Sequence, residues 1–101
     1  MQLDLENKDS VFYRIIEDRR AIKFRNKSRD INLMERINDK YFKLSVDPYS
    51  EAEDSFRSRK CPKCLKTNVG GYRIIYVVDN SQHIVLILDI GPRKNIYKKW
   101  D

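Results

Sequence analysis

The last third of the chain constrains the fold more than any other part, because it holds two strongly β-forming segments in close succession. Residues 72–78 and 84–90 are rich in β-branched and aromatic side chains, the residue types that strands favour. A shorter segment, residues 64–69, precedes them and ends at Gly70-Gly71, a pair typical of a two-residue hairpin turn. Strands joined by short turns pair antiparallel, so the sequence predicts an antiparallel sheet in this region.

The start of the chain changes from strand to helical periodicity. Residues 11–16 predict a strand from their β-branched and aromatic content. From Asp18, a candidate N-cap, apolar residues recur at helical spacing until Asn26-Lys27-Ser28 interrupts the pattern. A first, short helix is therefore expected between these two points.

A second helix is expected to follow, capped by Ser28 or Asp30. Its apolar positions recur in steps of three and four residues, as one face of a helix requires: Ile31, Met34, Ile37, Tyr41 and Leu44. The helix must end near Asp47, because the residue before Pro48 is driven out of the α region. Residues 48–60 are polar and predict a loop.

The predicted fold class is α+β: a small antiparallel β-sheet packed against two N-terminal helices, with a short C-terminal helix. Pro92 suits the first turn of that last helix, and Ile96 and Trp100 are its apolar positions. With 101 residues the chain is long enough for one domain. The sequence predicts a single domain over residues 1–101, with residues 1–10 as a loose lead-in.

The positive charge of the chain indicates a polyanionic or acidic partner. The formal net charge is +6, and the segment 57–73 holds six basic residues and no acidic one. Lysines on a strand edge also discourage edge-to-edge pairing. Charge alone therefore leaves RNA, DNA, an acidic protein and a simply solvated edge open.

A hairpin turn at Gly70-Gly71 fixes which side chains share a face of the sheet. In that register Asn68 lies opposite Arg73, and Lys66 lies opposite Ile75. Lys66, Asn68 and Arg73 then share one face, which is left for solvent or a ligand, while the more apolar opposite face meets the helices. The alternative is structural, with Arg73 paired with Asp89 across the sheet.

Two further side chains are expected near the rim of the same face. Arg93 and Tyr97 are four residues apart, so they lie on one side of a helix. Because that helix starts directly after the last strand, it can bring both residues close to Lys66 and Arg73. The sequence thus assembles a lysine, two arginines and a tyrosine.

This group of side chains suits cleavage of the RNA backbone, in which a 2′-hydroxyl attacks the adjacent phosphate. Arginines stabilise the negative charge of the transition state, and Lys66 is predicted to act as general base. Arg93 is predicted to protonate or shield the leaving oxygen, and Tyr97 to hold the sugar or stack on a base. The predicted RNA-binding residues around them are Lys60, Lys63, Asn68 and Lys94.

The chain resembles the RelE/ParE family of toxins from type II toxin–antitoxin systems. The resemblance rests on the segment Tyr72-Arg73-Ile74-Ile75-Tyr76 and on the closing Gly91-Pro92-Arg93 with Tyr97. It implies a ribosome-dependent mRNA endonuclease with Lys66, Arg73, Arg93 and Tyr97 as catalytic residues. It also implies a cytoplasmic protein, with the ribosome, mRNA and a cognate acidic antitoxin as partners. The second lysine of the family's strand motif is replaced here by Asn68.

Two other functions share this fold and stay open. One is the ParE-like inhibition of DNA gyrase, which involves no RNA cleavage. The other is a non-catalytic binding module derived from a degenerate toxin. The set of Lys66, Arg73, Arg93 and Tyr97 favours the ribonuclease over both.

No metal and no cofactor are predicted. Cys61-Pro62-Lys63-Cys64 supplies half of a structural zinc site, and His83, the one histidine of the chain, leaves such a site a ligand short. Both thiols are expected to be free in a reducing cytosol. A redox motif of the thioredoxin kind opens a helix, whereas this pair precedes a strand.

No membrane association is predicted. No stretch approaches the roughly 20 apolar residues of a membrane span. The first six residues are acidic rather than basic and lead into no apolar run, unlike a secretory signal. A cytoplasmic protein is therefore expected.

Overall fold

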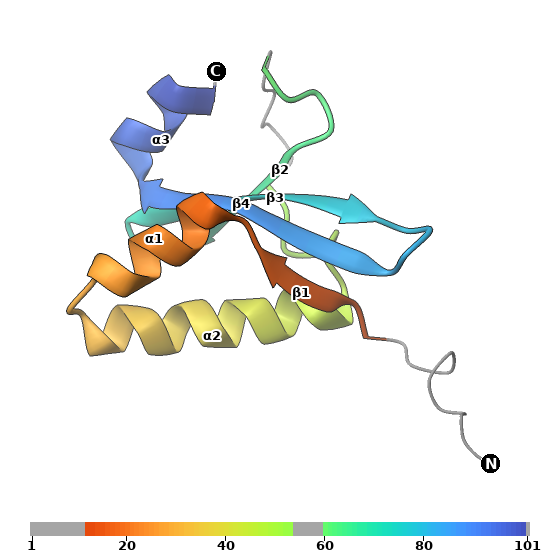
Figure 1. Ribbon diagram of the computed structural model, residues 1–101, viewed down its shortest axis with the longest axis horizontal. Coiled ribbons are helices and arrows are strands. Elements are labelled where there is room, and N and C mark those ends of the chain that lie inside the picture. The colour runs from red at the N-terminus through yellow and green to blue at the C-terminus, as the bar shows by residue number, and fades with distance from the viewer. Residues whose placement is uncertain (1–11, 54–59, 101) are drawn as a thin grey trace.

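The computed structural model describes residues 12–53 and 60–100. The elements follow in the order β1 (Arg14–Glu17), α1 (Arg19–Lys27), α2 (Ile31–Val46), β2 (Leu65–Val69), β3 (Tyr72–Asp79), β4 (Ile84–Pro92) and α3 (Arg93–Trp100). This order confirms the predicted α+β fold class (Figure 1). The lead-in over residues 1–10, the first residue of the predicted strand 11–16, and most of the distal half of the 48–60 loop lie outside the described residues.

The helix boundaries lie where the sequence places them. The Asp30 carboxylate caps α2 by accepting a hydrogen bond from the Leu33 N–H at 3.0 Å. Asp18 occupies the N-cap position of α1 but makes no side-chain capping bond. Asp47 is the C-cap of α2, directly before Pro48, so the predicted end of this helix is confirmed.

The hairpin register at Gly70-Gly71 is also confirmed. Gly70 has a φ of +60°, a conformation that glycine adopts without strain. Asn68 pairs with Arg73 and Lys66 pairs with Ile75. The faces of β2 and β3 are therefore those that the sequence predicted.

The sheet is mixed, in the order β1-β4-β3-β2. The strands β2, β3 and β4 are antiparallel as predicted, but β1 pairs parallel with β4, so the prediction of an entirely antiparallel sheet is wrong for this pair. The cause is the helical connection between β1 and β2. The end of α2 lies beside the start of β1, where the Tyr13 N–H donates to the Ser45 carbonyl at 2.7 Å, so β2 runs in the same direction as β1, as after a parallel crossover. The two hairpins that follow reverse the chain twice, and β4 therefore also runs parallel to β1.

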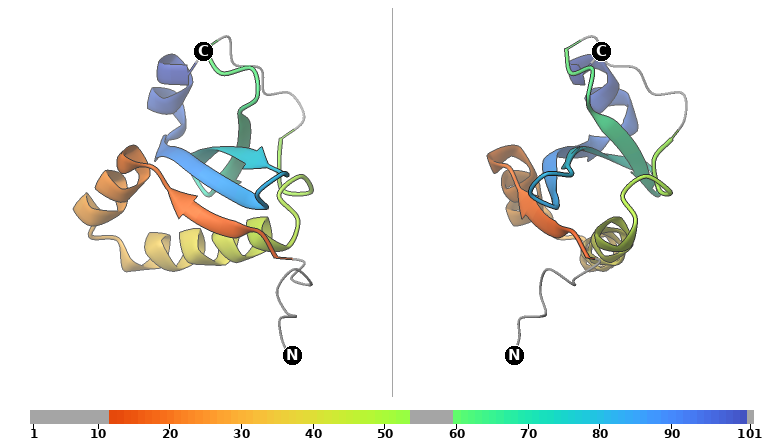
Figure 2. Two further views of the ribbon diagram at one scale, coloured as in Figure 1. Left: turned by 45° about the vertical axis from the view of Figure 1, so that its right-hand side comes forward. Right: turned by 90° about the vertical axis from the view of Figure 1, so that its right-hand side faces the viewer.

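The two faces of the sheet are covered by different helices (Figures 1 and 2). The main core lies between the sheet and the pair α1 and α2. Its buried members are Ala21, Leu33, Ile37, Leu44, Val69, Ile74, Tyr76, Val85, Ile87 and Ile90. On the opposite face α3 places Ile96 against Ile75 and Cys64. The predicted helix-facing side of β2 and β3 is thus confirmed.

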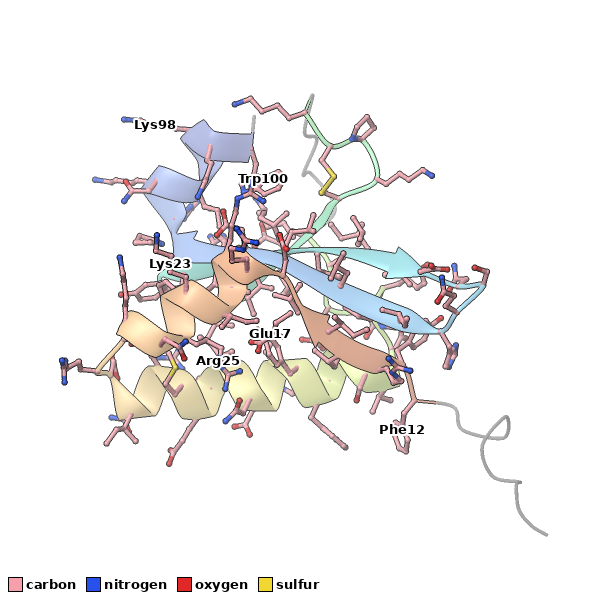
Figure 3. The ribbon with its side chains drawn as sticks, viewed as in Figure 1. Phe12, Glu17, Lys23, Arg25, Lys98 and Trp100 are labelled. Carbon is pink, nitrogen blue, oxygen red and sulfur yellow. A yellow bond between two sulfur atoms is a disulfide. The ribbon has the colours of Figure 1, made fainter. Side chains whose placement is uncertain are left out.

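A half-buried polar network ties the first three elements together. Glu17 of β1 accepts a hydrogen bond from the Tyr41 hydroxyl at 2.8 Å and forms an ion pair with Arg25 at 3.3 Å; Figure 3 labels Glu17 and Arg25. Burial and the neighbouring Glu17 carboxylate raise the pKa of Tyr41. These contacts fix α1 and α2 against the edge strand.

A β-bulge in β4 changes what this strand presents to α3. Ile75 pairs with Asp89, but Tyr76 pairs with Ile87, so Leu88 is the extra residue. Leu88 packs in the cluster around Ile96, and Asp89 is hydrogen-bonded to α3. Two consecutive residues of β4 therefore face the same helix.

No helix in the described part of the chain is long and apolar enough to cross a membrane. Within the same residues, no group of three or more histidine, cysteine, aspartate or glutamate side chains is arranged to hold a metal ion.

Candidate functional site

Two of the predicted catalytic residues, Lys66 and Arg73, lie on the face of the sheet that α3 covers. Lys66 on β2 and Arg73 on β3 lie on the same face, as the hairpin register requires. Arg93 is the first residue of α3, and its backbone N–H donates to the Gly71 carbonyl at 3.1 Å, so the helix begins against the β2–β3 turn. Tyr97 follows one helical turn later, but its side chain lies outside the described part of the structure.

Lys66 and Arg73 are buried, with only 4% and 5% of their surface exposed. The expectation that both arginines of the site face solvent is therefore wrong for Arg73, whereas Arg93 is exposed. One reason for the burial is that the chain after α2 turns back along β2: the Glu53 N–H donates to the Lys66 carbonyl at 2.8 Å. The terminal helix covers the neighbouring part of the same face.

The guanidinium of Arg73 is held by the backbone of the hairpin turn. Its Nη1 donates to the carbonyls of Gly70 and Tyr72, at 3.4 and 3.1 Å. Its buried Nε has no hydrogen-bond partner among the described residues. A buried charged donor that is left unused favours an anionic ligand, because charge-assisted hydrogen bonds are the strong ones.

Glu53 is a member of the site that the sequence did not reveal. Its carboxylate lies 3.1 Å from the Lys66 ammonium, and 27% of its side chain is exposed. Burial raises the pKa of Glu53, but hydrogen bonds from Lys66 and Asn68, and the charges of Lys66 and Arg73, outweigh burial and lower that pKa overall. The only available signal was indirect, since a buried lysine needs a counter-charge.

Asp89 does not pair with Arg73 in the described structure. It accepts hydrogen bonds from its own chain at Ile90 and from the Trp100 indole at 2.9 Å, and it lies 3.1 Å from the Lys99 ammonium. The structural alternative for Arg73 is therefore not realised. Asp89 instead anchors the last turn of α3 to the sheet.

The predicted RNA-binding residues do not form one patch. Asn68 lies beside Lys66 and Arg73, and Lys94 is exposed on the first turn of α3. Lys60 and Lys63 are exposed in the loop before β2. The Lys60 ammonium donates to the Lys99 carbonyl at 2.9 Å, which places it at the far end of α3 from Arg93.

The remaining histidine and cysteines have structural partners. His83 lies in the β3–β4 turn with a φ of 59°, and its ring stacks on Tyr13 at a centroid distance of 3.9 Å. Cys61 and Cys64 form a disulfide. The expectation of two free thiols is therefore wrong. The turn at residues 61–64, closed by a hydrogen bond from the Cys64 N–H to the Cys61 carbonyl, holds the two sulfurs within bonding distance.

Comparison of the fold with solved structures identifies its class. The toxin–antitoxin complex RelBE2 from Mycobacterium tuberculosis matches with a TM-score of 0.70 at 20% identity, covering 81% of this chain and 99% of that chain. The isolated Escherichia coli RelE toxin matches with a TM-score of 0.64 at 24% identity, over 86% and 93% of the two chains. The archaeal RelE–RelB complex from Pyrococcus horikoshii matches with a TM-score of 0.64 at 19% identity, over 81% and 96%. The fold is that of RelE toxins.

The family follows from the sequence itself. The family model described as the ParE toxin of the type II toxin–antitoxin system parDE matches residues 16–97. The chain therefore belongs to the RelE/ParE family of type II toxins. No curated protein sequence matches it.

Proposed function

We propose that this toxin is a ribosome-dependent mRNA endonuclease. The observation that carries the proposal is the buried Arg73, whose Nε has no hydrogen-bond partner among the described residues and which shares one face of the sheet with Lys66. Arg93 is exposed at the start of α3, which begins against the β2–β3 turn. Among the described residues, Lys66, Arg73 and Glu53 together carry a net charge of +1, and a phosphodiester is an anion that would match this charge. Such a toxin acts in the cytoplasm, where ribosomes and mRNA are.

The proposed reaction is transfer within the RNA backbone. The 2′-oxygen attacks the adjacent phosphorus, a 2′,3′-cyclic phosphate forms, and the bond to the next 5′-oxygen breaks as that oxygen takes a proton. Arg73 and Arg93 stabilise the charge that develops on the phosphate oxygens. Arg93, exposed on the first turn of α3, is proposed to protonate or shield the leaving oxygen, and Tyr97 is proposed to hold the sugar or stack on a base.

Lys66 is proposed as the general base, and Glu53 as the carboxylate that holds its ammonium group in place. As placed, the ammonium is held in an ion pair, and the lysine can accept the 2′-proton only after losing its own. The adjacent carboxylate is ionised at neutral pH, since its pKa is lowered. A variant that removes the carboxylate charge separates the two roles: cleavage persists in Glu53→Gln if Lys66 is the base, and is lost if the base is Glu53.

Cleavage of mRNA by purified ribosomes with added toxin is the direct test. Removing one transition-state donor costs about 10²- to 10³-fold, so Arg93→Ala, an exposed position, should lose cleavage without losing stability. Arg29→Ala, an exposed arginine between α1 and α2, is the matched control. Wild-type cleavage by both Arg93→Ala and a folded Arg73→Ala would refute the assignment of the site.

Inhibition of DNA gyrase is the alternative, and the description of the matching family as parDE toxins favours it. A supercoiling assay run beside the cleavage assay distinguishes the two. Inhibition of gyrase without RNA cleavage would establish the alternative. Neither activity, together with no growth inhibition on expression, would indicate a non-catalytic binding module.

We also propose a cognate acidic antitoxin that orders on binding and blocks the Arg73–Arg93 face. The support is the positive charge at this face and along α3, where Lys94 and Lys98 are exposed. Charge attraction accelerates association and weakens with salt. Co-expression with the neighbouring reading frame and copurification at two salt concentrations tests this. The complexes of RelBE2 and archaeal RelE–RelB supply the precedent for such a partner.

A further inference from the structure

A disulfide with a cavity beside it lies at the opposite end of α3 from Arg93. Cys61 and Cys64 are bonded across a four-residue loop, and the Cys64 N–H donates to the Cys61 carbonyl at 3.0 Å. This turn holds both sulfurs within bonding reach through the backbone alone. The bond can therefore open and close again without a rearrangement of the sheet.

The two sulfurs differ in access. Cys64 is 5% exposed and packs against Ile75 and Ile96, whereas Cys61 is half-buried. Thiol–disulfide exchange requires a thiolate to reach one sulfur in line with the bond. Cys61 is the more exposed residue of the pair, so we expect attack on its sulfur.

An open cavity of about 750 Å³ adjoins Cys61. It is lined by Lys60, Pro62 and Lys63 on the disulfide side and by residues 77–81 on the other, so its lining holds two lysines and one acidic residue, Asp79. Both lysine side chains reach solvent. Nearby lysines stabilise a thiolate and attract anionic molecules, and the volume accommodates a thiol of tripeptide size.

The loop is coupled to the last turn of α3. The Lys60 ammonium, next to Cys61 in the chain, donates to the Lys99 carbonyl at 2.9 Å. Cys61 and Trp100 pack on the same apolar cluster, and Figure 3 draws the disulfide and the labelled Trp100 on this side of the sheet. The oxidised loop thus restrains the end of the helix that begins with Arg93.

We propose that Cys61–Cys64 is a reversible thiol–disulfide exchange site for anionic low-molecular-weight thiols, and that its oxidised state holds the last turn of α3 in place. In the first step a thiolate attacks the Cys61 sulfur, forming a mixed disulfide and releasing the Cys64 thiolate, which takes a proton. A second thiolate attacks the small-molecule sulfur and releases Cys61. The protein disulfide gains two electrons, and two thiols become one small-molecule disulfide.

The test uses the full chain in buffers of reduced and oxidised glutathione. Alkylation followed by mass measurement counts the protein thiols, and fluorescence of Trp100, the one tryptophan of the chain, reports the last turn of α3. We expect a single two-electron transition, with a red shift of the emission on reduction. Cys61→Ser should show the reduced emission in every buffer.

A second measurement tests whether the lysines beside the disulfide attract anionic thiols. Lys63→Ala should slow reduction by glutathione about 3- to 10-fold at low salt and leave reduction by neutral mercaptoethanol within about 2-fold. Lys98→Ala, an exposed lysine on α3, should change neither rate. A disulfide that resists excess glutathione until the protein unfolds would overturn the exchange site. Identical Trp100 emission in both redox states would overturn its coupling to α3.

Discussion

Replacing Glu53 with glutamine removes the negative charge beside the Lys66 ammonium and keeps an oxygen that can accept its hydrogen bond. Lys66 is 4% exposed and its nitrogen lies 3.1 Å from the carboxylate. The substitution therefore takes one counter-charge away from a buried cation. Glu53→Gln should lower the free energy of unfolding at pH 7.

The size of the loss follows from the burial of the two partners. Breaking a fully buried ion pair costs about 3–5 kcal/mol, and an exposed pair contributes about 0–1 kcal/mol. Here the lysine is buried, but 27% of the Glu53 side chain is exposed, and the amide retains the hydrogen bond. A loss of about 1.5–3 kcal/mol is expected, which corresponds to about 6–24 °C in Tm for a domain of this size.

A double-mutant cycle with Lys66→Met separates the ion pair from other effects. Methionine has a similar length but no charge, so in Glu53→Gln/Lys66→Met no buried ammonium is left unpaired. Urea unfolding followed by circular dichroism should show the double variant losing less than the two single losses combined, by about 1 kcal/mol or more. Additive losses would show that the pair contributes nothing.

The pH dependence provides a further check on the same pair. The pKa of Glu53 is lower in the folded protein than in the unfolded chain, so its contribution is complete above the ordinary carboxyl pKa of about 4.3. It is lost as the pH falls through the lowered folded pKa. The stability difference between wild type and Glu53→Gln should shrink in that acidic range, and a difference that stays constant would refute the reasoning.

Two further predictions use matched neighbours in the chain. Gly70→Ala should lower the free energy of unfolding by about 1–2 kcal/mol, because Gly70 has a φ of +60° and an added Cβ would lie 2.7 Å from Arg36 Nη2. Gly71→Ala should leave the free energy of unfolding nearly unchanged in the same urea titration, because nothing lies within 4 Å of the added carbon. Asp30→Ala should lower the free energy of unfolding by about 0.5–2 kcal/mol, because it removes the side-chain cap of α2. Asp18→Ala, at a cap position without a side-chain bond, should cost clearly less, and equal losses would contradict the capping assignment.

Local signals accounted for much of the fold. The turn at Gly70-Gly71 fixed the pairing of Asn68 with Arg73, because a two-residue hairpin leaves one register. Asp30 and Pro48 marked the ends of α2 through capping and backbone sterics. Each of these features depends on residues that are close in sequence.

Long-range features could not be predicted in this way. The parallel pairing of Arg14 with Ile84 joins segments 70 residues apart, and no local pattern specifies such a partner. The same holds for Glu53, which reaches Lys66 across the loop after α2. The burial of Arg73 was missed because a charged strand face is ordinarily solvated, although Ile96 and Trp100 already marked α3 as a helix with an apolar face to bury.

The charge balance of the buried site connects these observations to the proposed reaction. Lys66 and Arg73 contribute two positive charges and Glu53 one negative charge, so these three residues carry a net charge of +1. A phosphodiester brings a single negative charge, which would balance the charge of these three residues. The transition state carries more negative charge than the substrate, and Arg93 at the rim supplies the additional cation that would stabilise it selectively. On this reasoning Arg73 contributes to substrate binding as well as to the transition state, and Arg93 mainly to the rate. Both alanine variants should therefore lower kcat, and a folded Arg73→Ala should in addition raise KM for the ribosome–mRNA complex.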